Sequence, residues 1–376
     1  MVKNVHIVLF IYLLLRFIIP AKLNIFTKIF LTGIFFLASQ MHRVYTQFGG
    51  TWFSPEFPRF VLIIYPWLLA GFLILTTVTI VKDIMIIGKL LLSLFGVKLS
   101  ISFSPRKVAV FMMSFSFILG AIGVWQGVKV PNVKVQEIYF DKLPKELDGT
   151  TIVLIADLHT SALNTRPLVQ GVVDKVNQLN PDLILFNGDM VDGTVKNRSD
   201  AVDPIRQLKA KYGIYGTTGN HEYYADYNNW LKKFKELGIN ILGNIHKNIS
   251  INGKTLTLVG VYDDMGKQAG KIGPNIVAAT KGINKDNITI LMAHRPGNAV
   301  ENSKYNIDLQ LSGHTHGGMI AGLNKIVATY NGGFVSKWYD VGKMKLYVSN
   351  GTSLWCGFPI RLGVPSEITQ FILRAK

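Results

Sequence analysis

The chain has almost no cysteine and, over its first third, almost no acidic residues. Cys356 is the one cysteine among 376 residues, which excludes an intramolecular disulfide framework and any metal site built from several thiolates. Only 17% of the residues are charged and 49% are hydrophobic, so the composition also excludes a disordered or low-complexity chain. A mean hydropathy of +0.28 leaves two explanations, a very large core or a part of the chain that lies in lipid.

The acidic residues are missing from one part of the chain. Residues 1–130 hold 12 Lys and Arg but 2 Asp and Glu, and residues 131–376 hold 28 and 21, so the net charge of +17 divides into +10 and +7. In the first part, basic residues flank long apolar runs, a pattern typical of membrane segments with headgroup contacts. We therefore expect a lipid bilayer as a partner and no nucleic acid.

Four apolar stretches predict membrane spans. Residues 60–81 and 108–125 carry no charge and match the roughly 20 residues that cross a bilayer core. Residues 5–19 and 23–41 contain Arg16 and Lys28, and a buried helical hairpin is the alternative for these two. Residues 84–97 are too short to span and predict a helix lying in the interface. Seven basic residues lie on each side of the predicted spans, so the positive-inside rule does not decide the orientation.

From Thr151 onward, short apolar runs alternate with polar, helix-like segments. The runs that predict strands are 152–156, 183–186, 214–217, 255–259, 288–292 and 309–311, and the amphipathic stretches that predict helices are 167–179 and 200–211. This alternation predicts an α/β domain with a largely buried sheet over residues 151–376. Residues 131–150 are predicted to be the linker between this domain and the membrane region at 1–130.

Polar clusters follow five of these predicted strands. They are Asp157-Leu158-His159, Gly188-Asp189-Met190-Val191-Asp192, Gly219-Asn220-His221-Glu222, His294, and Gly313-His314-Thr315-His316-Gly317. Loops beyond the carboxyl ends of strands in α/β sheets converge on one crevice, so these side chains are expected to meet. Carboxylate, amide and imidazole ligands without a thiolate suit Mn, Fe or Zn. Each cluster alone fits a turn or a helix cap, but all five in order predict a metal site.

This series resembles the calcineurin-like metallophosphoesterases, whose pattern is D-x-H, G-D-x-x-D, G-N-H-[DE], H and G-H-x-H. The resemblance covers about residues 151–373 and implies an αββα sandwich that holds two divalent ions, with Mn²⁺ as the first expectation and Fe or Zn as alternatives. The ligands it implies are Asp157, His159 and His316 for one ion, Asn220, His294 and His314 for the other, and Asp189 as the bridge between them. It also implies that His221 stabilises the reacting phosphate or protonates the leaving group, and that Asp192 orients His221.

Two arginines are candidate substrate contacts. Arg295 follows a predicted ligand directly, and Arg361 lies in a segment that resembles the closing segment of membrane-linked bacterial members of the family. Either guanidinium suits a second phosphate or an acidic head group, and an ordinary surface ion pair is the equal alternative for both.

Together these patterns predict an integral-membrane, dinuclear-metal hydrolase that cleaves a phosphate ester or diphosphate bond of a phosphorylated or nucleotide-linked lipid. Within the family that the chain resembles, one membrane-associated task is the cleavage of UDP-2,3-diacylglucosamine to UMP and lipid X in lipid A synthesis. We expect a multi-span pyrophosphatase of this kind, in a bacterial inner membrane, with a cytoplasmic catalytic domain. An extracytoplasmic phosphodiesterase that acts on envelope polymers or phospholipid, and a non-enzymatic receptor or transport component with a silent domain, are the alternatives.

Overall fold

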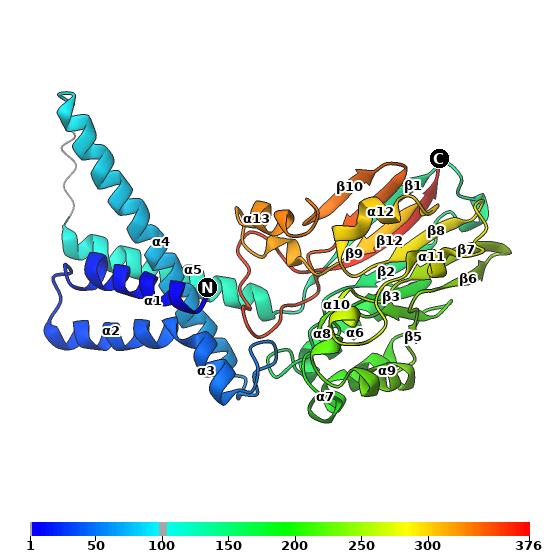
Figure 1. Ribbon diagram of the computed structural model, residues 1–376, viewed down its shortest axis with the longest axis horizontal. Helices are drawn as coiled ribbons and strands as arrows, with labels where there is room; N and C mark the ends of the chain where they lie inside the picture. The colour runs from blue at the N-terminus through cyan, green and yellow to red at the C-terminus, as the bar shows by residue number, and fades with distance from the viewer. Residues whose placement is uncertain (1, 98–103) are drawn as a thin grey trace. The chain divides into compact units, whose positions relative to one another are not determined.

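The protein consists of two compact units in the computed structural model, which describes residues 2–97 and 104–376 (Figure 1). One unit contains Met1–Trp125 together with Cys356–Ile360, and the other contains Gln126–Trp355 together with Arg361–Lys376. The first unit is built from helices, and the second contains two sheets with helices on their outer faces.

The helical unit is formed by long apolar helices. Its elements are α1 (Val2–Leu13), the π-helical turn η1 (Leu14–Ile18), α2 (Ile25–Ser39), α3 (Met41–Phe48), α4 (Val61–Leu94) and α5 (Pro105–Val128). Helices α4 and α5 approach closely where glycines meet, since a Cβ on Gly120 would lie 3.2 Å from the backbone nitrogen of Gly71. Small residues allow such close crossings of membrane helices.

Within the described residues, two helices are long and apolar enough to cross a membrane, compared with the four that we predicted. They are α4 and α5, and a third span results only if α2 and α3, which bend by 59° at their junction, count as one. The first predicted span is a shorter helix: η1 ends at Ile18, and Pro20, two residues further on, has no backbone N–H with which to continue the helical hydrogen bonds. Its 17 residues, Val2–Ile18, extend about 25 Å, less than the roughly 30 Å hydrocarbon core.

The prediction of a separate interfacial helix at 84–97 is wrong. Helix α4 runs without a break from Val61 through Leu94, so this stretch continues a predicted span. The two charged residues between the predicted span 60–81 and this stretch, Lys82 and Asp83, lie inside the helix, where Asp83 pairs with Arg16 at 2.8 Å. A partner on another helix removes the need to end α4 at these charges.

The second unit contains two six-stranded sheets. In spatial order, the first holds β1 (Asn132–Phe140), β12 (Glu367–Ala375), β2 (Thr151–Ile155), β3 (Leu183–Asn187), β4 (Ile214–Thr217) and β5 (Asn240–Ile241). The second holds β10 (Lys337–Val341), β11 (Met344–Val348), β9 (Leu309–Ser312), β8 (Ile288–Met292), β7 (Lys254–Gly260) and β6 (Ile245–Ile251). Strands β2 to β5 are parallel to one another, as are β7, β8, β9 and β11, so their carboxyl ends share an edge in each sheet.

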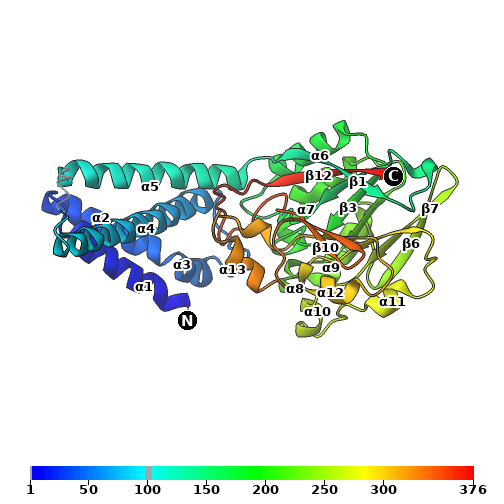
Figure 2. The ribbon, with the colours of Figure 1, turned by 90° about the horizontal axis from the view of Figure 1, so that it is seen from above.

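The layers follow the αββα order that we predicted, as Figures 1 and 2 show. Alternate residues of β2 face opposite sides: Ile152 and Leu154 pack between the sheets, and Val153 and Ile155 pack against outer helices. The helices of the outer layers and of the loops are α6 (Arg166–Gln178), α7 (Val195–Val202), α8 (His221–Tyr224), α9 (Tyr227–Glu236), α10 (Met265–Gln268), α11 (Ile276–Thr280), α12 (Ala299–Asn302) and α13 (Asn324–Thr329). Because both faces of each sheet are covered, inner strands such as β3 and β8 are buried at every position.

Two local predictions are corrected by the structure. Residues 131–150 are not a linker, because β1 lies there and pairs in parallel with β12, burying Ile138 and Phe140. The helix predicted at 200–211 is instead α7 followed by the 3₁₀ turn η3 (Asp203–Gln207), because Pro204 prevents α7 from continuing.

Candidate metal centre

The loops that follow five strands bring the predicted ligands into three overlapping groups. Within each group, the ligand atoms lie within 4.8 Å of one another, as expected for side chains that share an ion. The groups are Asp157, His159 and His316; His159, Asp189 and His221; and Asp189, His294 and His314. The first sheet supplies its ligands from β2, β3 and β4, and the second supplies them from β8 and β9.

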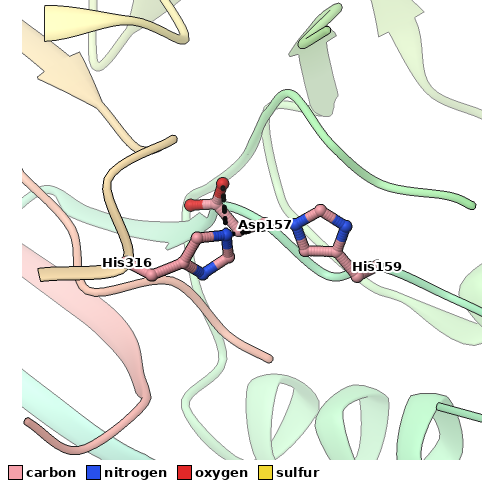
Figure 3. Close-up of side chains that lie close together, drawn as sticks. All are labelled: Asp157, His159 and His316. Atoms are coloured by element: carbon pink, nitrogen blue, oxygen red, sulfur yellow. Dashed lines mark hydrogen bonds and ion pairs between the residues drawn. The ribbon is translucent and has the colours of Figure 1, made fainter. Parts of the chain in front are cut away.

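The first group points at one shared position (Figure 3). The Nε2 atoms of His159 and His316 face each other at 3.3 Å, and Asp157 Oδ1 lies 3.8 Å from His316 Nε2. All three side chains are buried. Two imidazole nitrogens and a carboxylate oxygen with a common focus form the donor set of a hard or borderline divalent ion.

Asp189 belongs to the other two groups and connects the centre. Its Oδ2 lies 3.1 Å from His294 Nε2, 3.8 Å from His159 Nε2 and 4.0 Å from His221 Nε2. One carboxylate oxygen therefore faces ligands from both predicted ion sites. This is the position required of the bridging residue that the sequence resemblance implies.

Hydrogen bonds to the far nitrogens orient the imidazole rings. Asp192 Oδ1 accepts from Nδ1 of His159 at 3.0 Å and from Nδ1 of His221 at 2.6 Å, and the carbonyl of Asn187 accepts from His294 Nδ1 at 2.9 Å. Since these oxygens can only accept, each Nδ1 carries the proton. The Nε2 atoms of all three rings then face the centre, and for the predicted ligands His159 and His294 this is the arrangement that outer partners impose on metal-binding histidines.

A hydrogen bond also orients the side chain of Asn220. Its Nδ2 donates to the Tyr224 hydroxyl at 2.9 Å, and its buried Oδ1 has no hydrogen-bond partner among the described residues. A buried amide oxygen without a partner is costly, so it suits a metal ligand.

The charges of the buried groups favour metal binding as well. Burial by itself raises the pKa of Asp189, but His294, His221 and His159 outweigh it and hold this pKa well below its usual value. Burial lowers the pKa of His314 and His316, and neighbouring histidines and arginines lower it further. These two rings are thus neutral, the form that offers a lone pair to a metal. Burial opposes a charge on His221, yet Asp189 and Asp192 raise its pKa to about 9.

The backbone around the ligands is unusual. Five of the predicted ligands have a positive φ, which side chains other than glycine rarely adopt and which is concentrated at functional sites; they are Asp157, His159, Asp189, His314 and His316. The neighbouring glycines make this packing possible. A Cβ on Gly188 would lie 2.5 Å from His294 Nδ1, and one on Gly313 would collide with Asp157 Oδ2.

The donor set, the neutral rings and the oriented tautomers all fit a pair of divalent ions. Comparison with known proteins leads to the same family. A family model described as calcineurin-like phosphoesterase matches residues 150–318. An "Uncharacterized metallophosphoesterase" from Helicobacter pylori is 34% identical over 305 residues, which cover 77% of this chain and 80% of that protein. The chain is a calcineurin-like metallophosphoesterase.

A second relative extends the similarity beyond the catalytic domain of this metallophosphoesterase. The "Transmembrane protein with metallophosphoesterase domain" from Danio rerio is 31% identical over 297 residues, which cover 77% of this chain and 68% of that protein. That relative is named a transmembrane protein, and this chain has two helices, α4 and α5, that are long and apolar enough to cross a membrane.

The two predicted substrate arginines lie in different environments. Arg295 is at the edge of the metallophosphoesterase centre: its Nε donates to Asp263 at 2.9 Å, its Nη1 lies 3.2 Å from His314 Nε2, and 27% of its side chain is exposed. Beside it is a cavity of about 260 Å³ that His294, Asp263 and Lys267 help to line. Arg295 thus forms an ion pair with Asp263 at the edge of the centre, and its contact with a substrate phosphate stays a prediction.

Arg361 is instead used by the protein itself. Its guanidinium is 1% exposed and donates to the carbonyls of His316, Asn350 and Ser353 at 2.6–3.1 Å. These bonds connect the loop that contains His316 with Asn350 and Ser353. Arg361 therefore stabilises the position of a predicted ligand.

Sequence reasoning missed two further residues that hold the ligand loops. Glu222 accepts from the backbone nitrogens of Gly219, Asp189 and Met190 at 2.6–3.1 Å and so connects two loops. Asn164 donates to the carbonyls of His159 and Leu354. The glutamate was visible as the last residue of the G-N-H-[DE] motif, without its role, and the asparagine lies outside every motif.

Proposed function

We propose that this metallophosphoesterase hydrolyses a phosphate ester or diphosphate bond of a lipid-linked substrate. The observation that carries the proposal is a complete Asp, Asn and His centre in a chain that also has two helices apolar enough to cross a membrane. A hydrolase that acted on a soluble substrate would have no need of that helical unit.

The ligand histidines and carboxylates would hold two divalent ions, Mn²⁺ being our first expectation. When bound, such ions polarise phosphoryl oxygens and lower the pKa of a water molecule. His221 would donate from Nε2 to the leaving oxygen or to the reacting phosphate, because Asp192 fixes its ring through Nδ1. Arg295 would bind a phosphate oxygen at the edge of the centre, and Asp263 would hold its guanidinium in place.

For the substrate, we propose a phosphorylated or nucleotide-linked lipid, with UDP-2,3-diacylglucosamine as the first compound to test. The helical unit would keep the enzyme at the lipid surface where such a substrate resides. The cavity beside Arg295 would accept a polar group attached to the phosphate. With this substrate the protein would belong to lipid A synthesis, act at the bacterial inner membrane and face the cytoplasm.

The test uses the full-length protein in detergent micelles with Mn²⁺. Hydrolysis of bis(p-nitrophenyl) phosphate measures general phosphodiesterase activity. Release of UMP from UDP-2,3-diacylglucosamine measures activity on the proposed substrate. Asp189→Ala and His221→Ala should each lower both rates by at least about a hundredfold, since general acid–base groups contribute roughly 10²–10⁴-fold. His246→Ala is the control, because His246 lies in β6 and bonds to the carbonyl of Ala279.

The two readouts separate the reaction from the substrate. Hydrolysis of the generic diester without UMP release would refute the UDP-linked lipid as the substrate. The proposal of phosphodiesterase activity would then still stand. No hydrolysis of either compound with any of Mn²⁺, Fe²⁺ or Zn²⁺, or equal rates for Asp189→Ala and the unaltered protein, would overturn the enzymatic proposal. Chelation adds a readout besides rate: EDTA should lower the midpoint of thermal unfolding of the unaltered protein and leave that of Asp189→Ala nearly unchanged.

A further inference from the structure

The helical unit contains a charged cluster that phosphoester hydrolysis does not use. Asp83 on α4 accepts from Arg16 Nε on η1 at 2.8 Å and from the Tyr12 hydroxyl on α1 at 2.8 Å. Lys82 Nζ donates to the carbonyl of Arg16 at 3.2 Å and lies 3.5 Å from Asp83 Oδ1. Ionisable groups on apolar membrane helices are costly, so a cluster of them points to a function.

The cluster has more positive charge and more donors than its acid consumes. Two cations face one carboxylate. Asp83 Oδ2 accepts the bonds from Arg16 and Tyr12, and its buried Oδ1 has no hydrogen-bond partner among the described residues, with Lys82 Nζ 3.5 Å away. The side chain of Arg16 is 52% exposed, and among the described residues its terminal nitrogens Nη1 and Nη2 make no hydrogen bond. A guanidinium carries five N–H donors, so Arg16 can bind a second acceptor without leaving Asp83.

The backbone that carries Arg16 is also exceptional. Residues Leu14–Ile18 form a π-helical turn, with Ile19 N bonding to the carbonyl of Leu14 at 2.9 Å. Such turns are rare and recur at functional sites, because the wider turn re-aims a side chain. Here the turn carries the arginine that reaches α4.

A cleft of about 180 Å³ opens beside these cations, between η1, α4 and α5. Its walls combine the two cations with apolar side chains, namely Arg16, Lys82, Phe17, Ala21, Val108 and Met112. Pockets that enclose a drug-sized ligand measure roughly 300–1,000 Å³, so this cleft suits one end of a larger amphipathic molecule.

The level of the cluster along α4 agrees with a lipid headgroup. The uncharged stretch of α4 before Lys82 is Val61–Val81, 21 residues that extend about 31 Å, close to the thickness of the hydrocarbon core. Lys82 therefore falls at the headgroup layer if that stretch spans the core. Arg106 and Lys107 begin α5 beside Pro105 and Val108, which line the same cleft.

We infer that this cleft is a binding site for an anionic glycerophospholipid. Arg16 and Lys82 would donate to the phosphate oxygens, and the apolar wall of Phe17, Val108 and Met112 would contact the glycerol and the first methylenes. Basic pockets between membrane helices bind such head groups. A free phosphate ion shares the charge but has nothing to place against the apolar wall.

The test measures lipid binding by the full-length protein in phosphatidylcholine nanodiscs into which phosphatidylglycerol is titrated. Native mass spectrometry counts the retained phosphatidylglycerol, and the thermal unfolding midpoint gives an independent readout. A basic residue near a membrane surface strengthens the attraction to anionic lipid. Lys82→Gln should therefore weaken phosphatidylglycerol binding about fivefold. Arg16→Gln is made together with Asp83→Asn, so that no buried carboxylate loses its partner, and this double variant should weaken binding by at least as much.

Lys89→Gln is the matched control, because Lys89 is an exposed cation on the same helix that does not line the cleft. Unchanged binding by Lys82→Gln and by the double variant would overturn the inference, and so would an equal loss in Lys89→Gln. Inorganic phosphate and glycerol 3-phosphate form further arms, and stabilisation by either alone equal to that by phosphatidylglycerol would refute the lipid. None of these outcomes depends on phosphoesterase activity.

Discussion

Asp192 serves two histidines with one oxygen atom. The same Oδ1 accepts from His159, a predicted ligand, and from His221, the predicted proton donor. The D-x-H and G-N-H motifs are therefore coupled through a third residue that touches neither the proposed ions nor the substrate. Its loss should affect metal affinity as well as rate.

Asp192→Asn tests this coupling. Removing an outer partner of a metal-bound histidine costs roughly 10–100-fold in metal affinity or activity, and we expect losses of this size in both. Metal content after dialysis against a buffered Mn²⁺ series gives the affinity, and diester hydrolysis gives the rate. Asp340→Asn, at a side chain that is 82% exposed, should change neither. A lower rate with unchanged metal affinity would mean that Asp192 acts through His221 alone.

Arg361 distinguishes a structural role from a substrate contact. Burial lowers the pKa of its guanidinium to about 10, although Asp157 and Glu367 act in the opposite direction. Arg361→Met leaves several buried carbonyls without a donor, and we expect it to destabilise the domain by about 3 kcal/mol. For a domain of this size, that lowers the unfolding midpoint by roughly 6–12 °C.

Arg374→Met is the matched control for Arg361→Met. Arg374 forms a partly exposed pair with Glu137, so its loss should lower the unfolding midpoint much less than Arg361→Met does. A raised KM for Arg361→Met with an unchanged unfolding midpoint would contradict the structural role and restore the phosphate contact that the sequence suggested.

At the scale of elements, an aromatic cluster joins the two sheets. Phe371 on β12 of the first sheet contacts Trp338 on β10 and Tyr347 on β11 of the second, with ring centroids 5.9 and 5.0 Å apart. Phe371 is fully buried. The sandwich therefore depends on packing between strands of different sheets.

Phe371→Ala should destabilise the domain by about 3–5 kcal/mol, because it removes a large buried ring and leaves a cavity between the sheets. Urea unfolding followed by tryptophan fluorescence measures the loss. Val135→Ala on the neighbouring strand β1, at a side chain that is 52% exposed, should cost far less. Equal losses for the two variants would mean that the rings do not hold the sheets together.

How much of the fold the sequence predicts depends on how local each signal is. Strands such as β2 and β3 are predictable because each is an apolar run followed at once by a polar ligand cluster. Strand β1 is not, because its pairing with β12 joins residues more than 230 positions apart. The continuity of α4 was missed for the same reason, since the partner that neutralises Asp83 lies 67 residues away.

The candidate site shows the same limit. All the ligand groups are visible in the sequence, because each directly follows its own predicted strand. The residues that hold the ligand loops are harder to find: Asn164 lies outside every motif, and the motif that contains Glu222 does not show that its carboxylate bonds to the loop of Asp189. The different roles of Arg295 and Arg361 likewise depend on how deeply each side chain is buried. The residues on either side of each arginine do not indicate this.

At the scale of the whole molecule, the side of the membrane that the catalytic domain occupies stays a prediction. Cys356 is buried, so the native thiol is a poor reporter of orientation. Lys281→Cys in a Cys356→Ala background places a thiol at an exposed position between α11 and β8. A membrane-impermeant maleimide should label it only after cells are opened, because we expect a cytoplasmic domain.

The Cys356→Ala protein without the new cysteine is the control and should stay unlabelled throughout. Labelling of Lys281→Cys in intact cells would place the domain outside the cytoplasm. The UDP-linked substrate would then be excluded, and the phosphodiesterase that acts on envelope polymers or phospholipid would take its place.

The origin of the ligands in both sheets has a consequence for biosynthesis. Asp157, Asp189 and Asn220 follow strands of the first sheet, and His294, His314 and His316 follow strands of the second. Strand β12 lies inside the first sheet, between β1 and β2, yet it follows all the other strands in chain order. The first sheet is thus incomplete until β12 has been synthesised. We therefore expect the domain to bind its ions only after β12 has joined the first sheet, so that metal content would report assembly of both sheets.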